Sequence, residues 1–316
     1  MSGAVPRVAL ATAASSWDLD VDALLMLDAL EHEGVHATPA VWDDATFDWS
    51  AVDLVVVRST WDYMSRLAEF TNWAHRVERS TALANPAAVI EWNTDKRYLT
   101  ELEQRGVPIV PTVFLDAAAL DGDRAADAAR DALGRQLDAS ARGEAVVKPT
   151  VSAGSKDTLR VGGDDVGRGV ALAITLLRAG RNVMVQPYLD AVDEQGETGL
   201  VSLAGEFSHA FTKGAILRRG AGLVEGPYAE ERITAAVPSD DQLALRAAAL
   251  DAIGERFGPL LYARIDVITG DDGQPVVLEA ELTEPSLFLS VDHGAPARFA
   301  RAVRSWIDSP GGSSPD

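Results

Sequence analysis

Cysteine is absent from the 316-residue chain, and so are long apolar runs. Without cysteine the protein has no disulfide, no thiolate metal site and no cysteine nucleophile. No stretch approaches the roughly 18 uninterrupted apolar residues that a membrane-spanning helix needs. The residues before Val8 also lack the apolar core of a secretory signal, so the cytoplasm is the expected location.

Positive charge is scarce: Lys and Arg number 28 against 48 Asp and Glu, a formal net charge of −20. Such a surface repels phosphate backbones and anionic lipids, so neither nucleic acid nor a membrane is expected as a partner. A small phosphate ligand remains compatible, because Lys, Gly and backbone N–H groups can hold it inside an acidic shell. The length predicts about two domains, and the hydrophobic fraction of 47% predicts that the chain is folded.

Three common catalytic motifs are missing as well. The chain has no G-x-x-x-x-G-K-[ST] phosphate loop, no G-x-S-x-G nucleophile elbow and no H-E-x-x-H zinc motif. Gly220, Gly222 and Gly226 resemble a dinucleotide fingerprint, but the last spacing is one residue too long and no helix is expected after it. These absences exclude a P-loop protein and disfavour a dinucleotide site.

Strands and helices alternate in the first part of the chain, which predicts an α/β fold with a parallel sheet covered by helices. Ligands bind past the carboxyl ends of the strands in such sheets. Two segments fall there, Thr12–Asp18 and Arg58–Tyr63 (RSTWDY). The expected strands are Val5–Ala11, Ala37–Trp42 and Asp53–Val57, and the expected helices are Asp20–Glu33 and Leu67–Val77.

A boundary is expected near Asn85–Pro86, so the first domain is predicted at 1–90. A central subdomain at 91–190 and a C-terminal α+β subdomain at 191–308 would follow, with a disordered tail at 309–316. Helices are expected at Asn93–Arg105, Ala117–Leu137, Asp164–Arg178, Ser239–Arg256 and Ala295–Ile307, strands at Glu144–Lys148, Val183–Gln186, Leu261–Ile268 and Pro275–Leu282, and a loop at Thr150–Thr158.

Residues that could bind a ligand lie at the ends of several of these strands. Lys148 ends a buried apolar strand, where a lysine must be paired or face a ligand. The loop Ser152–Lys156 follows, and its backbone N–H groups could wrap phosphate oxygens. The Pro-bent end of the strand around Gln186 offers an amide to a planar base.

Two later strands carry charges at a period of two. Arg264 and Asp266 share one strand face, and so do Glu279 and Glu281. One Asp and two Glu on neighbouring strands make a hard-oxygen site that suits Mg²⁺. Taken singly, each feature has an ordinary interpretation, such as a solvated strand face or a plain loop. Their order and chemistry together are more specific than the parts.

In this order the residues resemble the ATP-grasp superfamily, which includes glutathione synthetase, D-alanine–D-alanine ligase and the ribosomal-protein glutamate ligases. The resemblance runs from about Asn93 to Leu289. It implies the ATP-grasp fold with an N-terminal pre-ATP-grasp domain, and an ATP-dependent carboxylate–amine ligase with two Mg²⁺ ions that Mn²⁺ can replace. It assigns Lys96 and Lys148 to the phosphates, Ser152, Gly154 and Ser155 to the lid, Gln186, Tyr188 and Leu189 to adenine, Asp193 or Glu197 to the ribose, and Asp266, Glu279 and Glu281 to the metal.

One departure from the family pattern concerns the metal strand. The family usually ends that strand as Glu-x-Asn, whereas this chain has Glu281 in the third ligand position, within E-A-E-L-T-E-P. In an alternative register Glu281 bridges the ions, Glu279 lies outside the site and Glu284 becomes a candidate. Both registers stay open at this point.

A narrower resemblance is to the subgroup that includes the cyclo-ligase forming D-cycloserine from O-ureido-serine. The segments VVVRSTWDY, NTDK, GEFSHAFTKGA and ELTEPSLFL are shared. The resemblance implies an antibiotic-biosynthetic enzyme with a small amino-acid-like substrate, and a homodimer is plausible. An intermolecular amino-acid or dipeptide ligase and a non-catalytic ATP-binding regulatory protein are the alternatives.

Catalytic and substrate residues follow from these segments. Arg264 is expected to stabilise the phosphoryl group or the oxyanion of the tetrahedral intermediate. Lys213 and Arg218 are further cationic candidates. At the substrate end, Asp62 is expected to pair with an ammonium, Trp61 or Tyr63 to wall the pocket, and Arg58 to hold a carboxylate or a ureido oxygen.

Overall fold

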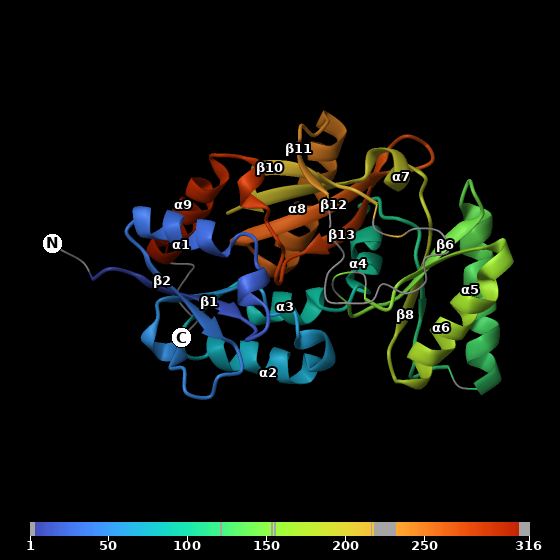
Figure 1. The fold of residues 1–316 in the computed structure, drawn as a ribbon, viewed down its shortest axis with the longest axis horizontal. Coiled ribbons are helices and arrows are strands. Elements are labelled where there is room, and N and C mark those ends of the chain that lie inside the picture. The colour runs from blue at the N-terminus through green and yellow to red at the C-terminus, as the bar shows by residue number, and fades with distance from the viewer. Residues whose placement is uncertain are drawn as a thin grey trace.

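Three sheets form the framework of the protein (Figure 1). Among the described helices, none is long and apolar enough to cross a membrane. The computed structural model describes residues 4–120, 122–152, 154, 156–215, 217 and 232–309. Of the residues singled out above, Ser155, Arg218, Gly220, Gly222, Gly226 and the tail from 310 lie outside these ranges.

The N-terminal sheet is four-stranded and wholly parallel, in the order β2-β1-β3-β4. Alternate residues of its strands pack on opposite faces: α1 and the C-terminal helix α9 cover one face, and α2 covers the other. The predicted parallel α/β fold is confirmed. The elements are β1 Arg7–Thr12, α1 Ala23–His32, β2 His36–Val41, β3 Leu54–Val57, α2 Leu67–Glu78, β4 Ala82–Ala84 and α9 Ala295–Asp308.

The central sheet has four strands in antiparallel pairs, in the order β5-β8-β6-β7. Its helices α5 and α6 pack on it and form the lobe at the right of Figure 1. The elements of this stretch are α3 Ala87–Asn93, α4 Tyr98–Gln104, β5 Val113–Leu115, α5 Gly122–Ala139, β6 Glu144–Pro149, β7 Leu159–Gly162, α6 Val166–Arg178, β8 Val183–Pro187 and α7 Ala191–Gln195.

The C-terminal sheet is five-stranded and antiparallel, in the order β11-β10-β9-β12-β13. Its central strands pack on α8, whose N-cap Ser239 forms a capping box with Gln242. The register of β12 on β13 pairs Asp266 with Glu279 and Arg264 with Glu281. The elements are β9 Glu197–Leu203, β10 Glu206–Lys213, β11 Ile233–Ala236, α8 Asp240–Phe257, β12 Tyr262–Thr269 and β13 Pro275–Glu281.

The helix predicted over Asn93–Arg105 was wrong in its extent, because α3 ends at Asn93 and α4 covers only Tyr98–Gln104. Asn93 ends α3, and its buried side chain donates to the Ala280 carbonyl (2.8 Å) and accepts from the Leu282 N–H (2.8 Å). The anchored asparagine therefore lies between the helices instead of opening one. The three-residue strands β4 and β5 were not predicted, since so short a run carries no periodicity.

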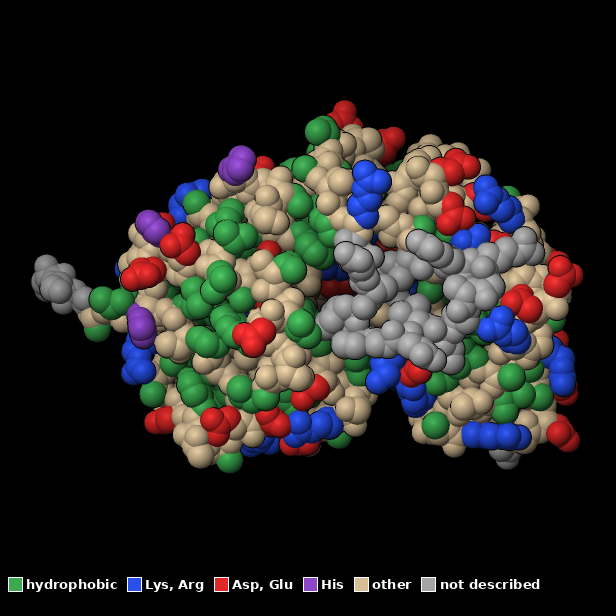
Figure 2. Space-filling model, in the orientation of Figure 1, with side chains coloured by type: hydrophobic (Ala, Val, Ile, Leu, Met, Phe, Trp, Pro, Cys, Tyr) green, Lys and Arg blue, Asp and Glu red, His purple; other side chains and the backbone are tan. Residues whose placement is uncertain are grey.

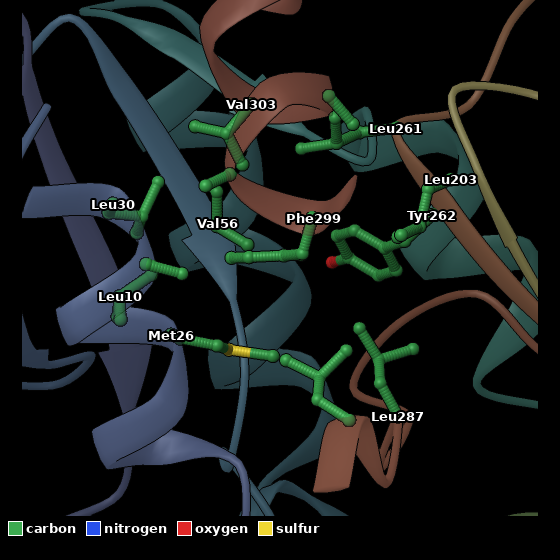
Figure 3. Packing of buried hydrophobic residues seen from close by; sticks show 14 of the residues in the cluster. Leu10, Met26, Leu30, Val56, Leu203, Leu261, Tyr262, Leu287, Phe299 and Val303 are labelled. Carbon is green, nitrogen blue, oxygen red and sulfur yellow. The ribbon is translucent and has the colours of Figure 1, made fainter. Parts of the chain in front are cut away.

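One hydrophobic core joins the two ends of the chain. Leu10 and Met26 from β1 and α1 belong to the same cluster as Tyr262, Leu287 and Phe299. Figure 3 shows these side chains meeting between the N-terminal sheet, the C-terminal sheet and α9. The division at residues 90 and 190 stays a prediction. The helix α9, although last in sequence, contacts α1 as well as β9 and β10.

Candidate active site

A cavity of 640 Å³ opens between the three sheets. Figure 2 shows a recess near the centre of the drawn face, in which acidic side chains are visible. Most of the predicted site residues line the cavity, although they come from distant parts of the sequence. They are Trp61, Tyr63, Lys96, Lys148, Ser152, Gly154, Gln186, Tyr188, Leu189, Glu197, Lys213, Arg264, Glu279, Glu281 and Glu284.

The charged groups of β12 and β13 form a paired network at the cavity wall. Asp266 accepts from Arg264 Nε and Nη2 (both 2.8 Å) and from Lys213 Nζ (2.7 Å). Arg264 also binds Glu281, and Lys213 Nζ lies 3.1 Å from Glu197 Oε2. Asp266 is 1% exposed and lies behind these cations rather than in the cavity lining.

The pKa values of these carboxyl groups diverge. Burial acts to raise the pKa of Asp266, but Arg264 and Lys213 outweigh it and hold the pKa at about 2. Burial raises the pKa of Glu281 to about 8, assisted by Asp266 and Glu279 and opposed by Arg264. Burial likewise raises the pKa of Glu284 to about 7, opposed by a hydrogen bond with Tyr63. Glu281 and Glu284 therefore take up a proton more readily than an exposed glutamate, whereas Asp266 stays ionised at neutral pH.

The donor set suits Mg²⁺ in its chemistry, since it consists of carboxylate oxygens on adjoining strands. The raised pKa values of Glu281 and Glu284 come mainly from burial, and a bound dication would favour the ionised form of both groups. Within the described ranges, however, no three His, Asp or Glu side chains are arranged to hold a metal ion. Each predicted ligand instead faces a lysine or an arginine.

Two lysines stand where the resemblance expects phosphates. Lys96 Nζ donates to the Ser152 carbonyl (2.7 Å) and lies 2.9 Å from Glu279 Oε1, so it ties the predicted lid loop to β13. Lys148 lines the same cavity, and burial lowers its pKa, with Glu279 opposing. Buried ammonium groups at the wall of a cavity are suited to binding an anion there.

The expected adenine end lies at the end of β8. Gln186 Nε2 donates to Thr112 Oγ1 (2.9 Å), and the Tyr188 N–H donates to the Glu144 carbonyl (2.8 Å). The Tyr188 N–H is thus engaged within the chain, although Tyr188 and Leu189 both line the cavity. Asp193 lies outside the cavity lining, because its carboxylate binds Arg160 and the Tyr188 hydroxyl. Glu197, the alternative ribose residue, is in the lining.

The RSTWDY segment is split between the cavity and the interior. Trp61 and Tyr63 line the cavity, as expected. Asp62 does not, since it accepts from Trp42 Nε1 (2.9 Å) and lies 3.4 Å from Arg66 Nη1. Arg58 is 1% exposed and also absent from the lining. The structure therefore does not bring Asp62 and Arg58 to the position where they were expected to hold a substrate.

Comparisons with known proteins identify the family of the chain. The cycloserine biosynthesis protein DcsG of Streptomyces lavendulae is 40% identical over 302 residues, which cover 94% of this chain and 97% of that protein. The chain belongs to the DcsG family. Residues 8–85 match the family model of the N-terminal domain of D-cycloserine synthetase DcsG. A crystal structure of D-cycloserine synthetase DcsG superposes with a TM-score of 0.87 at 38% identity, covering 95% of this chain and 99% of that one.

The fold extends to more distant ligases. D-alanine–D-alanine ligase from Bacillus anthracis superposes with a TM-score of 0.67 at 15% identity, over 96% of this chain and 97% of that chain. The ATP-grasp fold expected from the sequence is thereby confirmed. As a member of the DcsG family, the chain is an ATP-dependent ligase that forms a carbon–nitrogen bond.

Sequence reasoning missed part of the cavity wall. Leu19 and Val21 line it from the segment after β1, and Ser286 and Phe288 line it from the loop after β13. The second pair lies within ELTEPSLFL, a segment that resembles the subgroup, in which only Glu281 and Glu284 had an expected role. Alternate residues of this segment face the core and the cavity, and that period of two could have predicted which side chains line the cavity.

Proposed function

We propose that this DcsG-family ligase closes a ring in an O-ureido-serine-like amino acid. The substrate carboxylate attacks the γ-phosphorus of ATP, which releases ADP and leaves an acyl phosphate. A nitrogen of the same molecule then attacks the acyl carbon, and phosphate departs as the carbon–nitrogen bond forms. The activation is needed because oxide is a poor leaving group whereas phosphate is a good one.

One observation carries this proposal: a single cavity is lined both by the basic groups suited to a triphosphate and by the aromatic groups of the N-terminal segment. Lys96 and Lys148 line it together with Trp61, Tyr63 and Arg264. Both ligands can thus occupy one enclosed space, which lets the phosphoryl group pass directly between them.

Arg264 and Lys213 are the proposed cationic catalytic groups. Asp266 binds the side chains of both, so both are fixed before substrate enters. Preorganised cations of this kind stabilise charge that develops on the phosphoryl oxygens or on the tetrahedral oxyanion. No nucleophile from the protein is needed, which is consistent with a chain that has no cysteine.

Asp266, Glu279 and Glu281 would hold Mg²⁺ together with ATP, with Glu284 as the alternative ligand; to reach an ion, Asp266 would have to exchange its contacts with Arg264 and Lys213. The ions would neutralise charge on the transferring phosphoryl group. We propose two ions, replaceable by Mn²⁺, because both favour carboxylate oxygens. Gln186 and Leu189 are proposed for adenine and Glu197, in preference to Asp193, for the ribose, since Glu197 lies in the cavity wall.

The cytoplasm is the proposed location, since it supplies ATP, and a homodimer is the proposed assembly. The net charge of −20 supports the absence of a nucleic-acid partner. An intermolecular ligase remains the second candidate, because Trp61 and Tyr63 suit any small amino acid.

The test is ADP release by the purified protein against a panel of amino acids that includes both enantiomers of O-ureido-serine, with mass spectrometry of the product. Ring closure predicts ADP release with one amino acid alone and a cyclic product. A product joined from two amino acids would favour the intermolecular ligase. ATP binding without ADP release for any member of the panel would contradict both.

A further inference from the structure

Asp22 is a buried carboxylate that binds the backbone of a distant loop. It is 0% exposed, and its two oxygens accept from the N–H groups of Leu287 (2.7 Å), Phe288 (2.9 Å) and Leu289 (2.6 Å). Three consecutive N–H groups on one carboxylate are strong, charge-assisted hydrogen bonds. They fix an irregular segment in which Phe288 adopts a left-handed backbone, with φ of 49°.

Arg58 completes the arrangement from the end of β3. Its Nη1 donates to the Pro285 carbonyl (2.8 Å), and its Nη2 lies 3.5 Å from Asp20 Oδ2 and 3.6 Å from Asp22 Oδ2. A guanidinium between two buried carboxylates offsets the cost of burying them. The charged trio of Asp20, Asp22 and Arg58 therefore connects the N-terminal sheet to the loop that follows β13.

The loop held in this way alternates between the core and the cavity. Leu287 and Leu289 are buried in the core shared with Met26, and Figure 3 shows Met26 and Leu287 in this cluster. Ser286, which precedes Leu287, and Phe288, which lies between the two leucines, line the cavity. A shift of this backbone would thus move two wall residues.

The segment that carries the carboxylates has the same alternation. Asp20 and Asp22 point to Arg58, whereas Leu19 and Val21 line the cavity although they are 51% and 62% exposed. The charged trio therefore sets the relative position of two wall segments, neither of which carries the lysines expected at the triphosphate.

The loop also contacts the catalytic arginine. Arg264 Nη1 donates to the Ser286 carbonyl (2.8 Å), one residue from the carbonyl that Arg58 binds. The position of the loop backbone therefore affects the guanidinium that is proposed to face the reacting carboxyl group.

We propose that Asp22 and Arg58 are positioning residues that hold the Pro285–Leu289 loop against the amino-acid end of the cavity, and that they determine how well the amino-acid substrate binds. Neither side chain touches the substrate. This inference deepens the proposed function and rests on it for the identity of the substrate. It also replaces the direct substrate contact that the sequence suggested for Arg58.

The experiment compares Asp22→Asn and Arg58→Lys with the wild type in steady-state kinetics, with Asp28→Asn, an exposed change on α1, as the matched control. Asp22→Asn is expected to raise the KM for the amino acid by about tenfold or more and to lower kcat/KM by up to about 10²-fold, because a small misplacement of wall residues has such effects. The KM for ATP should stay within about twofold. Arg58→Lys keeps the charge but cannot span the same acceptors, so its effect should be intermediate.

Hydrogen exchange gives a second measurement that needs no substrate. The amides of 287–289 should exchange faster in Asp22→Asn than in the wild type or in Asp28→Asn, because they lose their charged acceptor. Unchanged exchange there overturns the proposal, whatever the substrate is. If Asp22→Asn does not fold, Arg58→Lys decides the question by the change in the two KM values.

The kinetic outcomes separate positioning from general stability. A variant that is merely less stable loses active enzyme, so kcat falls while both KM values stay unchanged, and that result overturns the proposal. A parallel rise of the KM values for ATP and the amino acid also overturns it. If the wild type releases no ADP with O-ureido-serine, the proposed substrate is wrong, and the KM comparison is then made with whichever amino acid of the panel promotes ADP release.

Discussion

Replacing Asp266 by Asn tests whether the carboxylates of the cavity wall are held by cations or repel one another. From the sequence alone, three acidic residues on two strands would repel in the absence of metal, so neutralising one should cost the fold little. The structure predicts the opposite, because Asp266 accepts three charge-assisted hydrogen bonds from Arg264 and Lys213.

The size of the effect follows from the pKa of Asp266, which falls from 3.8 to about 2 in the folded protein. Since a tenfold change in an equilibrium constant is about 1.4 kcal/mol, this difference corresponds to roughly 2–3 kcal/mol of stability at neutral pH. Because the folded pKa is the lower one, the contribution is complete above pH 3.8 and is lost as the pH falls through about 2. Lys213 and Arg264 keep Glu197 and Glu281 as partners, so the loss should stay near 2–3 kcal/mol, below the roughly 5 kcal/mol of a fully broken buried pair.

Thermal unfolding in the absence of nucleotide and Mg²⁺ is the assay. Asp266→Asn should melt roughly 5–10 °C below the wild type, at about 2–4 °C per kcal/mol for a chain of this class. The control is Asp271→Asn, an exposed change in the turn between β12 and β13, which should leave the melting temperature unchanged. A melting temperature of Asp266→Asn equal to or above that of the wild type would refute the pairing of Asp266 with Arg264 and Lys213.

Three further predictions concern other parts of the molecule. Trp61→Ala should raise the KM for the amino acid about tenfold without changing the KM for ATP, because a lost aromatic wall is worth about 1–2 kcal/mol. Its neighbour Asp62→Asn should change neither KM by more than about twofold. A large effect of Asp62→Asn would mean that the Asp62 carboxylate reaches the substrate. Lys148→Met should weaken binding of a non-hydrolysable ATP analogue by about tenfold or more in calorimetry, since it removes a buried cation from the cavity wall, and unchanged affinity would exclude the lysine from the triphosphate site. Asn85→Ala should lower the free energy of unfolding by about 3 kcal/mol in urea titration, because three buried backbone groups at the start of β12 and the end of β13 lose their partner. A loss below about 1 kcal/mol would contradict that role.

The strands and their chemistry were predictable because the relevant patterns are local. The apolar run before Arg58 indicates a strand buried on both faces, and β3 is buried throughout. The period of two in β12 and β13 brought Arg264, Asp266, Glu279 and Glu281 to one network, and their register pairs them as neighbours.

The partners of these charges were not predictable, because they depend on residues far apart in sequence. Arg58 binds the Pro285 carbonyl, 227 positions away, so a residue that looked suited to a substrate carboxylate is an interior contact. The periodicity that puts Asp266 on a strand face also cannot tell that Lys213, from another strand, binds it. Asn93 is similar, since the groups that end its helix are backbone groups of β13 and the residue after it.

Transfer of labelled oxygen tests most directly whether the enzyme activates a carboxylate with ATP. The amino-acid substrate is prepared with ¹⁸O in both carboxylate oxygens and turned over with unlabelled ATP, and the inorganic phosphate is analysed by mass spectrometry. Formation of an acyl phosphate followed by attack of the ring nitrogen predicts one ¹⁸O atom in each phosphate released. Unlabelled phosphate, with product formed, would contradict activation of the carboxylate and with it the assignment of the cavity as the place where the phosphoryl group passes from ATP to the amino acid.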